Sequence, residues 1–335
     1  MSTGPSAGVR PRLHFLPRDG WVGDLFGVLR VEGRYHLFYE HRSGNGTPGG
    51  WGRAVSDDLV IWREQPVVAA PGAGPRWCGS VVDGVRGPVL FFGRTGEGVF
   101  KAEAASGLGG WSTGPDAVIA GELGDPYVFG DGDGGWRMIV AGAGGVLQYR
   151  SVDLESWDYD GVLVERDGAS CPRLFPLAGA WVLLLGNGDV IEYAVGDYDG
   201  RTFTPLGWDV FGRGDLGPAA TFVDDGGRRV VLARLGSDEG TLSVPWILSV
   251  HGGRLLATPH PHLDRYLISG ISGLSAARGE VRDHGEVILR MPVGGETLVL
   301  ADAGIVEVTV EGVSGLGAAS RVVPGDPGAH IARFA

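Results

Sequence analysis

Short runs of hydrophobic residues alternate with glycine- and aspartate-rich turns from residue 26 to about residue 250. The runs are rich in β-branched and aromatic residues, which favour strands, and almost no segment has the period of a helix. The clearest runs are residues 28–31, 35–39, 89–92, 127–129, 138–141, 181–185, 190–193 and 230–233. Several of them are separated by Glu-Gly or Asp-Gly pairs, which are typical of hairpin turns. The pattern predicts an all-β fold.

A recurring phrase divides this region into units of similar length. Residues 56–62 (SDDLVIW) and 151–157 (SVDLESW) share one pattern, with a shorter version at 106–111 and a weaker one at 199–203. The aromatic residue that ends each copy stands at position 62, 111, 157 or 203, so the spacings are 49, 46 and 46 residues. A unit of this length with about four short strands is typical of a propeller blade. Together with the strand that precedes the first copy, the repeat predicts a five-bladed β-propeller over residues 1–255.

The pattern changes after residue 255. Residues 260–280 look irregular, and three strand-like runs follow at 286–292, 296–301 and 305–311. About 50 residues are too few for a full two-sheet sandwich. We therefore predict that residues 256–335 form a small β unit packed on the propeller, a truncated remnant of a sandwich and a candidate homodimer contact.

Composition narrows the class of partner and the cellular compartment. The formal net charge of −12 and the pI near 5.1 argue against nucleic acid, which requires a basic surface. No apolar run reaches the roughly 20 residues of a membrane span, and the first 15 residues hold no signal-peptide core. We therefore expect a cytoplasmic protein without a membrane partner.

Cysteine and histidine usage suggests neither a disulfide framework nor a metal site. Cys78 and Cys171 are the only cysteines. One bridge between them would suit an oxidising compartment, but buried free thiols are the expectation for a cytoplasmic protein. His260 and His262 lack a third ligand nearby and are expected at the surface. No motif implies a metal or an organic cofactor.

Residues 11–27 (PRLHFLPRDGWVGDLFG) resemble the opening motif of glycoside hydrolase family 32, the invertases, inulinases and levanases. That motif reads R-P-x-F/Y-H-F/Y-x-P-x-x-G-W-M/I/L-N-D-P-N-G. Later segments resemble further family motifs in the same order: residues 35–40 (Y-H-L-F-Y-Q, with Glu40 for the Gln), 51–62 (W-G-H-A-x-S-x-D-L-V-H-W), 77–80 (F-S-G-S), 124–129 (R-D-P-x-V-F) and 170–175 (E-C-P-x-L-F). The resemblance covers nearly the whole chain and implies a five-bladed propeller with its site in the central funnel.

The resemblance also implies roles for three residues. A retaining glycosidase uses two carboxyl groups, one as nucleophile and one as acid/base. Asp24 matches the nucleophile and Asp125 the transition-state stabiliser, whereas Ser170 stands where the family has its acid/base Glu. A serine hydroxyl does not titrate near neutral pH, and loss of general-acid assistance lowers rates by about 10²- to 10⁴-fold. Glu165 and Asp167 are near enough in sequence to substitute for it, although a loop intervenes.

Other departures from the family motifs fall around the same position. Gly23 replaces the Asn before the nucleophile, Leu25 and Phe26 replace the Pro-Asn after it, and Gly124 and Arg53 replace an Arg and a His. Most of these changes remove a polar group, so we expect a funnel suited to a less polar, oxygen-bearing ligand. The candidate substrate-binding residues are Trp21, Phe26, Trp51, Arg53, Trp77 and Cys78. Core packing is the alternative role for the three tryptophans, and turn capping for the two aspartates.

Three functions follow as hypotheses. The first is a non-hydrolytic enzyme that binds a polyoxygenated small molecule and promotes its cyclisation, cycloaddition or ring rearrangement, as a step in natural-product biosynthesis. The second is a glycoside hydrolase or fructosyltransferase with altered acid catalysis. The third is a propeller that binds a ligand without changing it.

Overall fold

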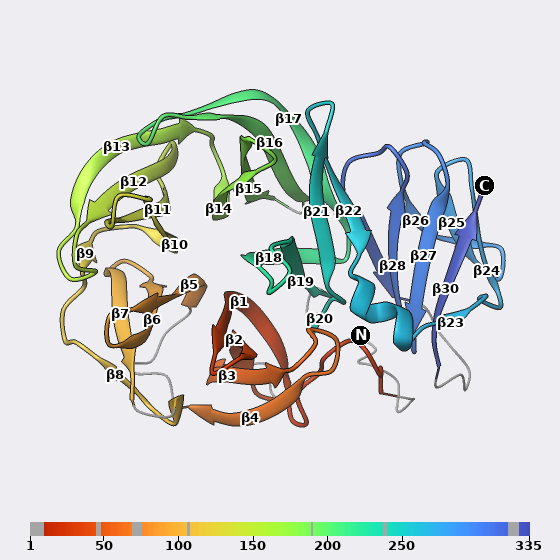
Figure 1. Ribbon diagram of the computed structural model, residues 1–335, viewed down its shortest axis with the longest axis horizontal. Helices are drawn as coiled ribbons and strands as arrows, with labels where there is room; N and C mark the ends of the chain where they lie inside the picture. The colour runs from red at the N-terminus through yellow and green to blue at the C-terminus, as the bar shows by residue number, and fades with distance from the viewer. Residues whose placement is uncertain are drawn as a thin grey trace.

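The computed structural model describes residues 10–44, 48–68, 76–105, 108–188, 190–236, 240–320 and 328–335, with only the backbone at positions 48, 76, 77 and 320. Five β-sheets surround a central axis and a smaller β unit lies at one side (Figure 1). The all-β, five-bladed propeller predicted from the sequence is confirmed. Among the described residues, no helix is long and apolar enough to cross a membrane.

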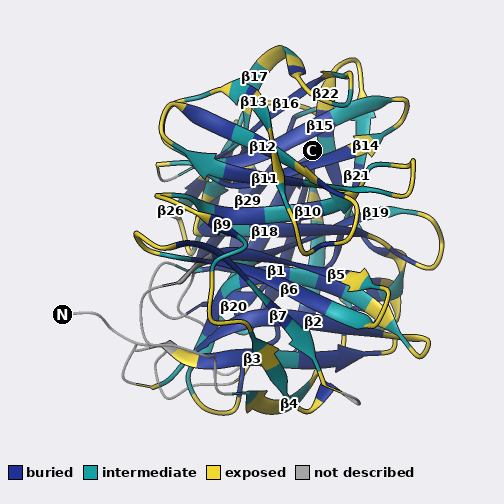
Figure 2. Ribbon diagram, turned by 90° about the vertical axis from the view of Figure 1, so that its left-hand side faces the viewer, coloured by how far each residue is buried: buried dark blue, intermediate teal, exposed yellow. Residues whose placement is uncertain are grey.

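Each blade is an antiparallel meander whose first strand lies nearest the axis (Figure 1). Blade 1 contains β1 (Trp21–Val31), β2 (Arg34–Arg42), β3 (Pro48–Ser56) and β4 (Arg63–Val68). Blade 2 contains β5 (Arg76–Gly84), β6 (Gly87–Arg94), β7 (Gly98–Ala104), β8 (Trp111–Thr113) and β9 (Ile119–Ala120). Blade 3 contains β10 (Gly124–Gly130), β11 (Trp136–Gly142), β12 (Gly145–Ser151) and β13 (Asp158–Glu165). Blade 4 contains β14 (Ala169–Leu177), β15 (Ala180–Asn187), β16 (Val190–Tyr198) and β17 (Phe203–Gly214). Blade 5 contains β18 (Leu216–Val223), β19 (Arg229–Leu235), β20 (Thr241–Leu242), β21 (Trp246–His251) and β22 (Arg254–Pro259). Buried residues are concentrated in these strands and exposed ones in the turns (Figure 2).

The repeated sequence phrase forms the turn between the third and fourth strands of a blade. In blade 1, Asp58 Oδ1 accepts hydrogen bonds from two backbone N–H groups, and the Asp58 N–H donates to Ser56 Oγ. Ser151 and Asp153 make the equivalent contacts in blade 3. The leucine that follows each aspartate has a positive φ in both copies. Local hydrogen bonding therefore explains why blades 1 and 3 carry the same phrase at the same turn.

The N-terminal segment closes the propeller and ties it to the C-terminal unit. Leu242 N–H donates to Phe15 O at 3.0 Å, which joins this segment to blade 5. The buried His14 ring lies between two carboxylates of the C-terminal unit, with Nδ1 2.9 Å from Asp302 Oδ2 and Nε2 2.9 Å from Glu307 Oε1. Glu307 also accepts from the indole N–H of Trp246 in blade 5, at 2.7 Å. One buried polar network thus joins the three parts.

The C-terminal unit is built from two packed sheets. Its elements are the 3-10 helix η2 (Pro261–Arg265) and the strands β23 (Ile268–Ser269), β24 (Leu274–Ala277), β25 (Glu280–Asp283), β26 (Glu286–Arg290), β27 (Thr297–Asp302), β28 (Ile305–Val310), β29 (Leu316–Ser320) and β30 (Ala329–Phe334). Strands β24–β26 form one sheet, and β29, β28, β27, β30 and β23 extend the sheet of blade 4 through the parallel pair β17–β29. The two sheets share a hydrophobic core that includes Val281, Leu289 and Val308.

Two expectations for this region change. The outermost strand of blade 5 runs to Pro259, four residues past the predicted end of the propeller at residue 255. His260 is fully buried, with Nε2 3.0 Å from Asp224 Oδ2, so its expected place at the surface was wrong. Sequence spacing does not indicate this pairing, because Asp224 follows β18 and His260 follows β22.

Candidate functional site

The innermost strand of every blade is interrupted at the same place, near its first residues. The strand register shifts between Val22 and Leu25, Arg76 and Gly79, Gly124 and Tyr127, Ser170 and Arg173, and Leu216 and Ala219. Such bulges bend a strand and re-aim the side chains that they carry. Asp24, Cys78, Asp125 and Cys171 all stand in these bulges, in blades 1 to 4. The repeated bulge therefore gathers residues from four separate motifs around the axis.

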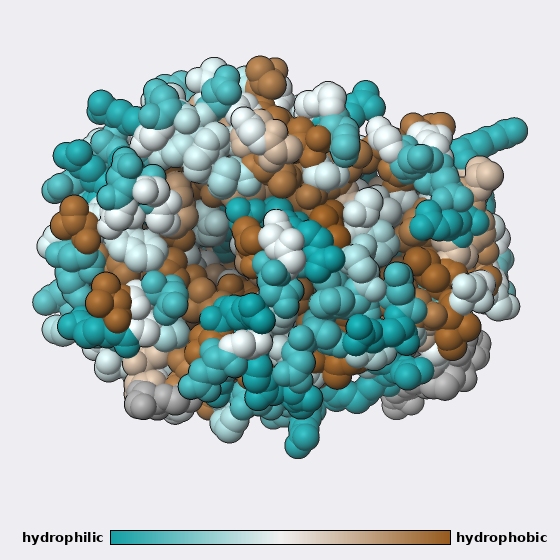
Figure 3. All heavy atoms as spheres, viewed as in Figure 1, coloured by the Kyte–Doolittle hydropathy of each residue, from teal (hydrophilic) through white to brown (hydrophobic). Residues whose placement is uncertain are grey.

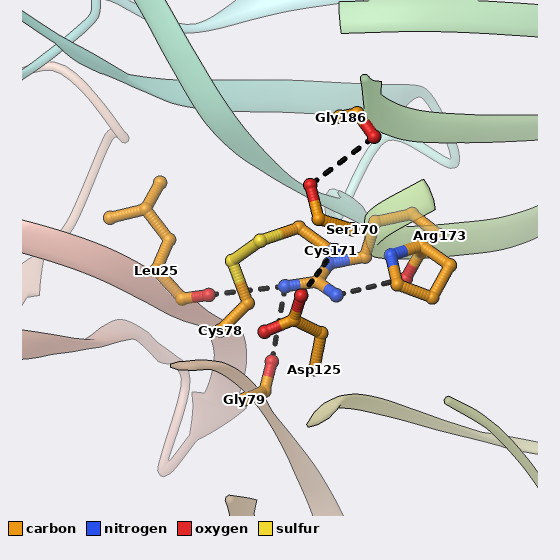
Figure 4. The surroundings of a disulfide bond; sticks show 9 residues. Leu25, Cys78, Gly79, Asp125, Ser170, Cys171, Arg173 and Gly186 are labelled. Atoms are coloured by element: carbon orange, nitrogen blue, oxygen red, sulfur yellow. Dashed lines mark hydrogen bonds between the residues drawn. A yellow bond between two sulfur atoms is a disulfide. The ribbon is translucent and has the colours of Figure 1, made fainter. Parts of the chain in front are cut away.

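Cys78 and Cys171 form a disulfide, with 5.5 Å between their Cα atoms and 93 residues between them in sequence. The expectation of free thiols was wrong, because the bulges of blades 2 and 4 bring the two side chains together across the axis. Asp125, from the intervening blade 3, lies beside the bridge (Figure 4). The face of the molecule drawn in the space-filling view is hollowed in the middle of the propeller, with hydrophobic and hydrophilic atoms around the hollow (Figure 3).

Asp24 lies beside the disulfide, and one of its carboxylate oxygens is within 4.8 Å of both sulfur atoms. Burial raises the pKa of this carboxyl, and the guanidinium groups of Arg234, Arg42 and Arg173 oppose that rise. The half-buried carboxylate thus stands in a positively charged surrounding at the axis.

Asp125 is 4% exposed, and its Oδ2 accepts a hydrogen bond of 2.8 Å from the Cys171 N–H. Burial raises the pKa of Asp125 to about 6. The hydrogen bond from Cys171 opposes this rise, and the nearby charge of Asp24 adds to it. Asp125 and Cys171 have φ angles of 54° and 45°, a left-handed conformation that strains residues other than glycine. Strain of this kind is concentrated at functional sites. Because the charge of Asp24 acts on Asp125, the two carboxyl groups lie near each other in the structure.

Ser170 opens the bulge of blade 4, but its hydroxyl is turned away from Asp125 (Figure 4). Its Oγ donates to the carbonyl oxygen of Gly186 at 3.2 Å, on the side away from Asp125 (Figure 4). Glu165 and Asp167, the sequence candidates for a substitute acid, are both exposed, Glu165 at the end of the outermost strand of blade 3. Neither takes the place that the resemblance assigns to the acid/base group.

Comparison with known proteins shows the family of this chain. The profile of the glycosyl hydrolases family 32 N-terminal domain matches residues 14–250. The chain belongs to glycoside hydrolase family 32. It is 30% identical to sucrose-6-phosphate hydrolase of Escherichia coli over 52% of this chain and 43% of the relative, and 32% identical to levanase of Bacillus subtilis over 58% and 35%. The matched region is thus less than half of either relative.

Solved structures show the same architecture. A β-fructofuranosidase from Bombyx mori, solved in complex with sucrose, superposes with a TM-score of 0.79 at 19% identity, over 97% of this chain and 93% of that one. This likeness extends through the C-terminal unit. It supports the family-32 fold and, at this identity, the fold alone.

A buried arginine at the centre of this family-32 propeller was not singled out from the sequence. Arg173 is 1% exposed and donates to the carbonyl oxygens of Pro172, Leu25 and Gly79 at 2.9, 3.2 and 3.1 Å (Figure 4). Its guanidinium also lies 5.2 Å from the centre of the Tyr127 ring. One side chain therefore links blades 1 to 4 and compensates the charges of the two aspartates. The available signal was an Arg between Pro172 and Leu174, inside one of the motifs that resemble the family.

Glu40 is a third carboxyl, on the second strand of blade 1 and near Asp24, at the position where the family motif has Gln. It is 2% exposed, and Arg42 Nε donates to its Oε2 at 3.1 Å. Burial raises the pKa of Glu40, the Arg42 charge opposes that rise, and the Asp24 charge adds to it. The same carboxylate would collide with any side chain at position 23, so Gly23 and Glu40 fit each other. Sequence comparison showed both changes but not that they meet.

The predicted substrate-binding side chains do not all reach the axis. Phe26 and Trp51 are each 2% exposed and pack in the hydrophobic core between blades 1 and 2, so the structure gives them no surface for a ligand. Trp21 is half-buried at the start of β1. Arg53 lies on the third strand of blade 1, with Nη1 3.1 Å from His36 Nδ1. The side chain of Trp77 lies outside the described residues.

Proposed function

We propose that this family-32 chain binds a polyoxygenated small molecule beside Asp24 and Asp125, at the part of the propeller axis that we call the mouth. The protein then rearranges this molecule without hydrolysis, by cyclisation, cycloaddition or ring rearrangement. The observation that carries the proposal is the direction of the Ser170 hydroxyl, which donates to Gly186 O and points away from Asp125. A reaction that needs no leaving-group protonation is compatible with such a site, whereas efficient cleavage of an alkyl fructoside is not.

The charges at the mouth suit a rearrangement. Asp125 has a pKa of about 6, because of its burial, and can accept or donate a proton near neutral pH. Arg42, Arg173 and Arg234 act electrostatically on Asp24 and would stabilise negative charge that develops on a ligand oxygen. A rigid, strained scaffold that holds a flexible ligand in one conformation lowers the entropic barrier to ring formation.

The test is to incubate the purified protein with oxygenated metabolites made by the enzymes that its neighbouring genes encode. The mixture is then analysed by mass spectrometry. We expect a product isomeric with its precursor, and no product with Asp24→Asn. Sucrose and 4-nitrophenyl β-D-fructofuranoside serve as comparison substrates. Asp24-dependent hydrolysis of either one would overturn the proposal, and recovery of every bound metabolite unchanged would favour a binding protein.

A second candidate function is hydrolysis with Glu40 as the acid. It is favoured by one observation: Glu40 is a buried carboxyl whose pKa is raised and which interacts electrostatically with Asp24. Glu40→Gln would then abolish cleavage of sucrose while sparing the aryl fructoside, because nitrophenolate leaves without a proton. Equal loss on both substrates, or no hydrolysis by the parent protein, would exclude this role.

A further inference from the structure

Asp24, Cys78 and Cys171 place one carboxylate oxygen and two sulfur atoms within 4.8 Å of one another. We propose that reduction of the disulfide converts the mouth of the propeller into a binding site for a thiophilic divalent cation, Zn²⁺ in the first place. The two thiolates and the Asp24 carboxylate are its ligands. This inference does not depend on the proposed function.

The spacing of the donors suits a small cation. Zinc binds thiolate sulfur at about 2.3 Å and carboxylate oxygen at about 2.0–2.2 Å in a tetrahedral arrangement. Tetrahedral ligands at these bond lengths are roughly 3.5–3.8 Å apart. The carboxylate oxygen lies within 4.8 Å of both sulfur atoms, and the two sulfur atoms are joined to each other. Once the S–S bond breaks, side-chain rotation must move the two sulfur atoms apart to that separation.

The three ligands come from rigid and independent elements. Each stands in the bulge of an inner strand, in β1, β5 and β14, and Arg173 holds these strands together through the carbonyl oxygens of Leu25 and Gly79. Asp125 accepts the Cys171 N–H and so fixes the backbone of one ligand, as outer-shell partners do in metal sites. Preorganisation of this kind lowers the entropy lost when a metal binds.

The donor atoms also determine which kind of cation fits this site. Thiolate ligands select zinc over magnesium and calcium, and three protein ligands leave a fourth position open towards a ligand.

The chemistry of the conversion balances. A small-molecule dithiol supplies two electrons and two protons, the Cys78–Cys171 bond breaks to give two thiols, and the dithiol becomes a cyclic disulfide. Metal binding then releases the two thiol protons to solvent.

The experiment compares the oxidised and the reduced protein. The protein is reduced with a dithiol, separated from it without air, and titrated with Co²⁺ and then with Zn²⁺. We expect one metal per chain, a thiolate-to-cobalt charge-transfer band that Zn²⁺ removes, and neither signal in the oxidised protein. A reduced protein that binds no stoichiometric metal, or an oxidised protein that binds equally well, would overturn the proposal.

Variants separate this site from metal bound elsewhere. Asp24→Asn should weaken Zn²⁺ binding by at least about tenfold, since even outer-shell changes have effects of that size. Asp116→Asn, at an exposed position, is the matched control and should leave the affinity unchanged. Cys171→Ser should remove the charge-transfer signal. An Asp24→Asn protein with the affinity of the parent would show that Asp24 is not a ligand.

Discussion

The Glu40 carboxylate fills the space beside Gly23. Its Oε2 lies 2.5 Å from the point where a Cβ on Gly23 would stand, and the backbone carbonyl oxygen of Glu40 lies 2.9 Å from the same point. Family 32 has Asn and Gln in the two corresponding motif positions. The loss of one side chain and the gain of a carboxylate are therefore a coupled change next to Asp24.

Gly23→Ala should destabilise the protein by about 1–3 kcal/mol, because the new methyl group meets both the side chain and the backbone of Glu40. Urea denaturation measures this effect. Gly207→Ala is the matched control, since Gly207 is also in a strand and a Cβ there meets no atom within 4 Å. Equal stabilities of the two variants would show that Glu40 moves aside freely.

Asp125→Asn should stabilise the protein at pH 8 and have little effect at pH 4. The folded-state pKa of about 6 lies above the ordinary value of 3.8, so the favourable contribution of the protonated carboxyl is complete below pH 3.8 and is lost as the pH rises through 6. Asparagine does not ionise, so the variant avoids this loss of folding stability, which is up to about 3 kcal/mol. Thermal unfolding at the two pH values measures the difference.

Asp153→Asn provides the opposite sign as a control. Backbone N–H groups of Ser156 and Glu155 lower the pKa of Asp153, so its ionised form stabilises the fold above the ordinary pKa and the variant should be less stable at pH 8. A loss of stability in Asp125→Asn at pH 8 would contradict the assignment of a raised pKa.

His14 should make stability fall between pH 6.5 and 9. Burial alone would lower the pKa of this imidazole, but its hydrogen bonds to Asp302 and Glu307 and their charges outweigh burial and raise the pKa to about 9. Its contribution is complete below pH 6.5 and is lost as the pH rises through 9, a change on the order of 3 kcal/mol. His14→Gln should have a flatter profile in urea denaturation over this window. The same slope in both proteins would assign the effect to other groups.

Arg173→Met should destabilise the protein by about 3–5 kcal/mol, because it leaves three buried carbonyl oxygens without this donor and removes one positive charge near two aspartates. Arg150→Met, at an exposed position on β12, should stay within about 0.5 kcal/mol of the parent. Urea denaturation of both variants tests this. Similar small effects would mean that the blades hold together without Arg173.

The sequence by itself determined the blades and the family. The Ser56–Asp58 and Ser151–Asp153 turns depend on hydrogen bonds within a few residues, so their chemistry recurs in the sequence with the period of the fold. The motifs around Asp24 and Asp125 carried the likeness to family 32 and placed both aspartates at one site. Each of these features is local to one blade.

Only the tertiary structure decided what surrounds Asp24. The Cys78–Cys171 bridge, the contacts of Arg173 and the fit of Glu40 to Gly23 join different strands or blades, and the bridge spans 93 residues. Such contacts depend on how five bulged strands are rotated about a common axis, which no sequence spacing records. Cysteines expected to be free thiols are therefore joined, and a serine in a catalytic motif position points elsewhere.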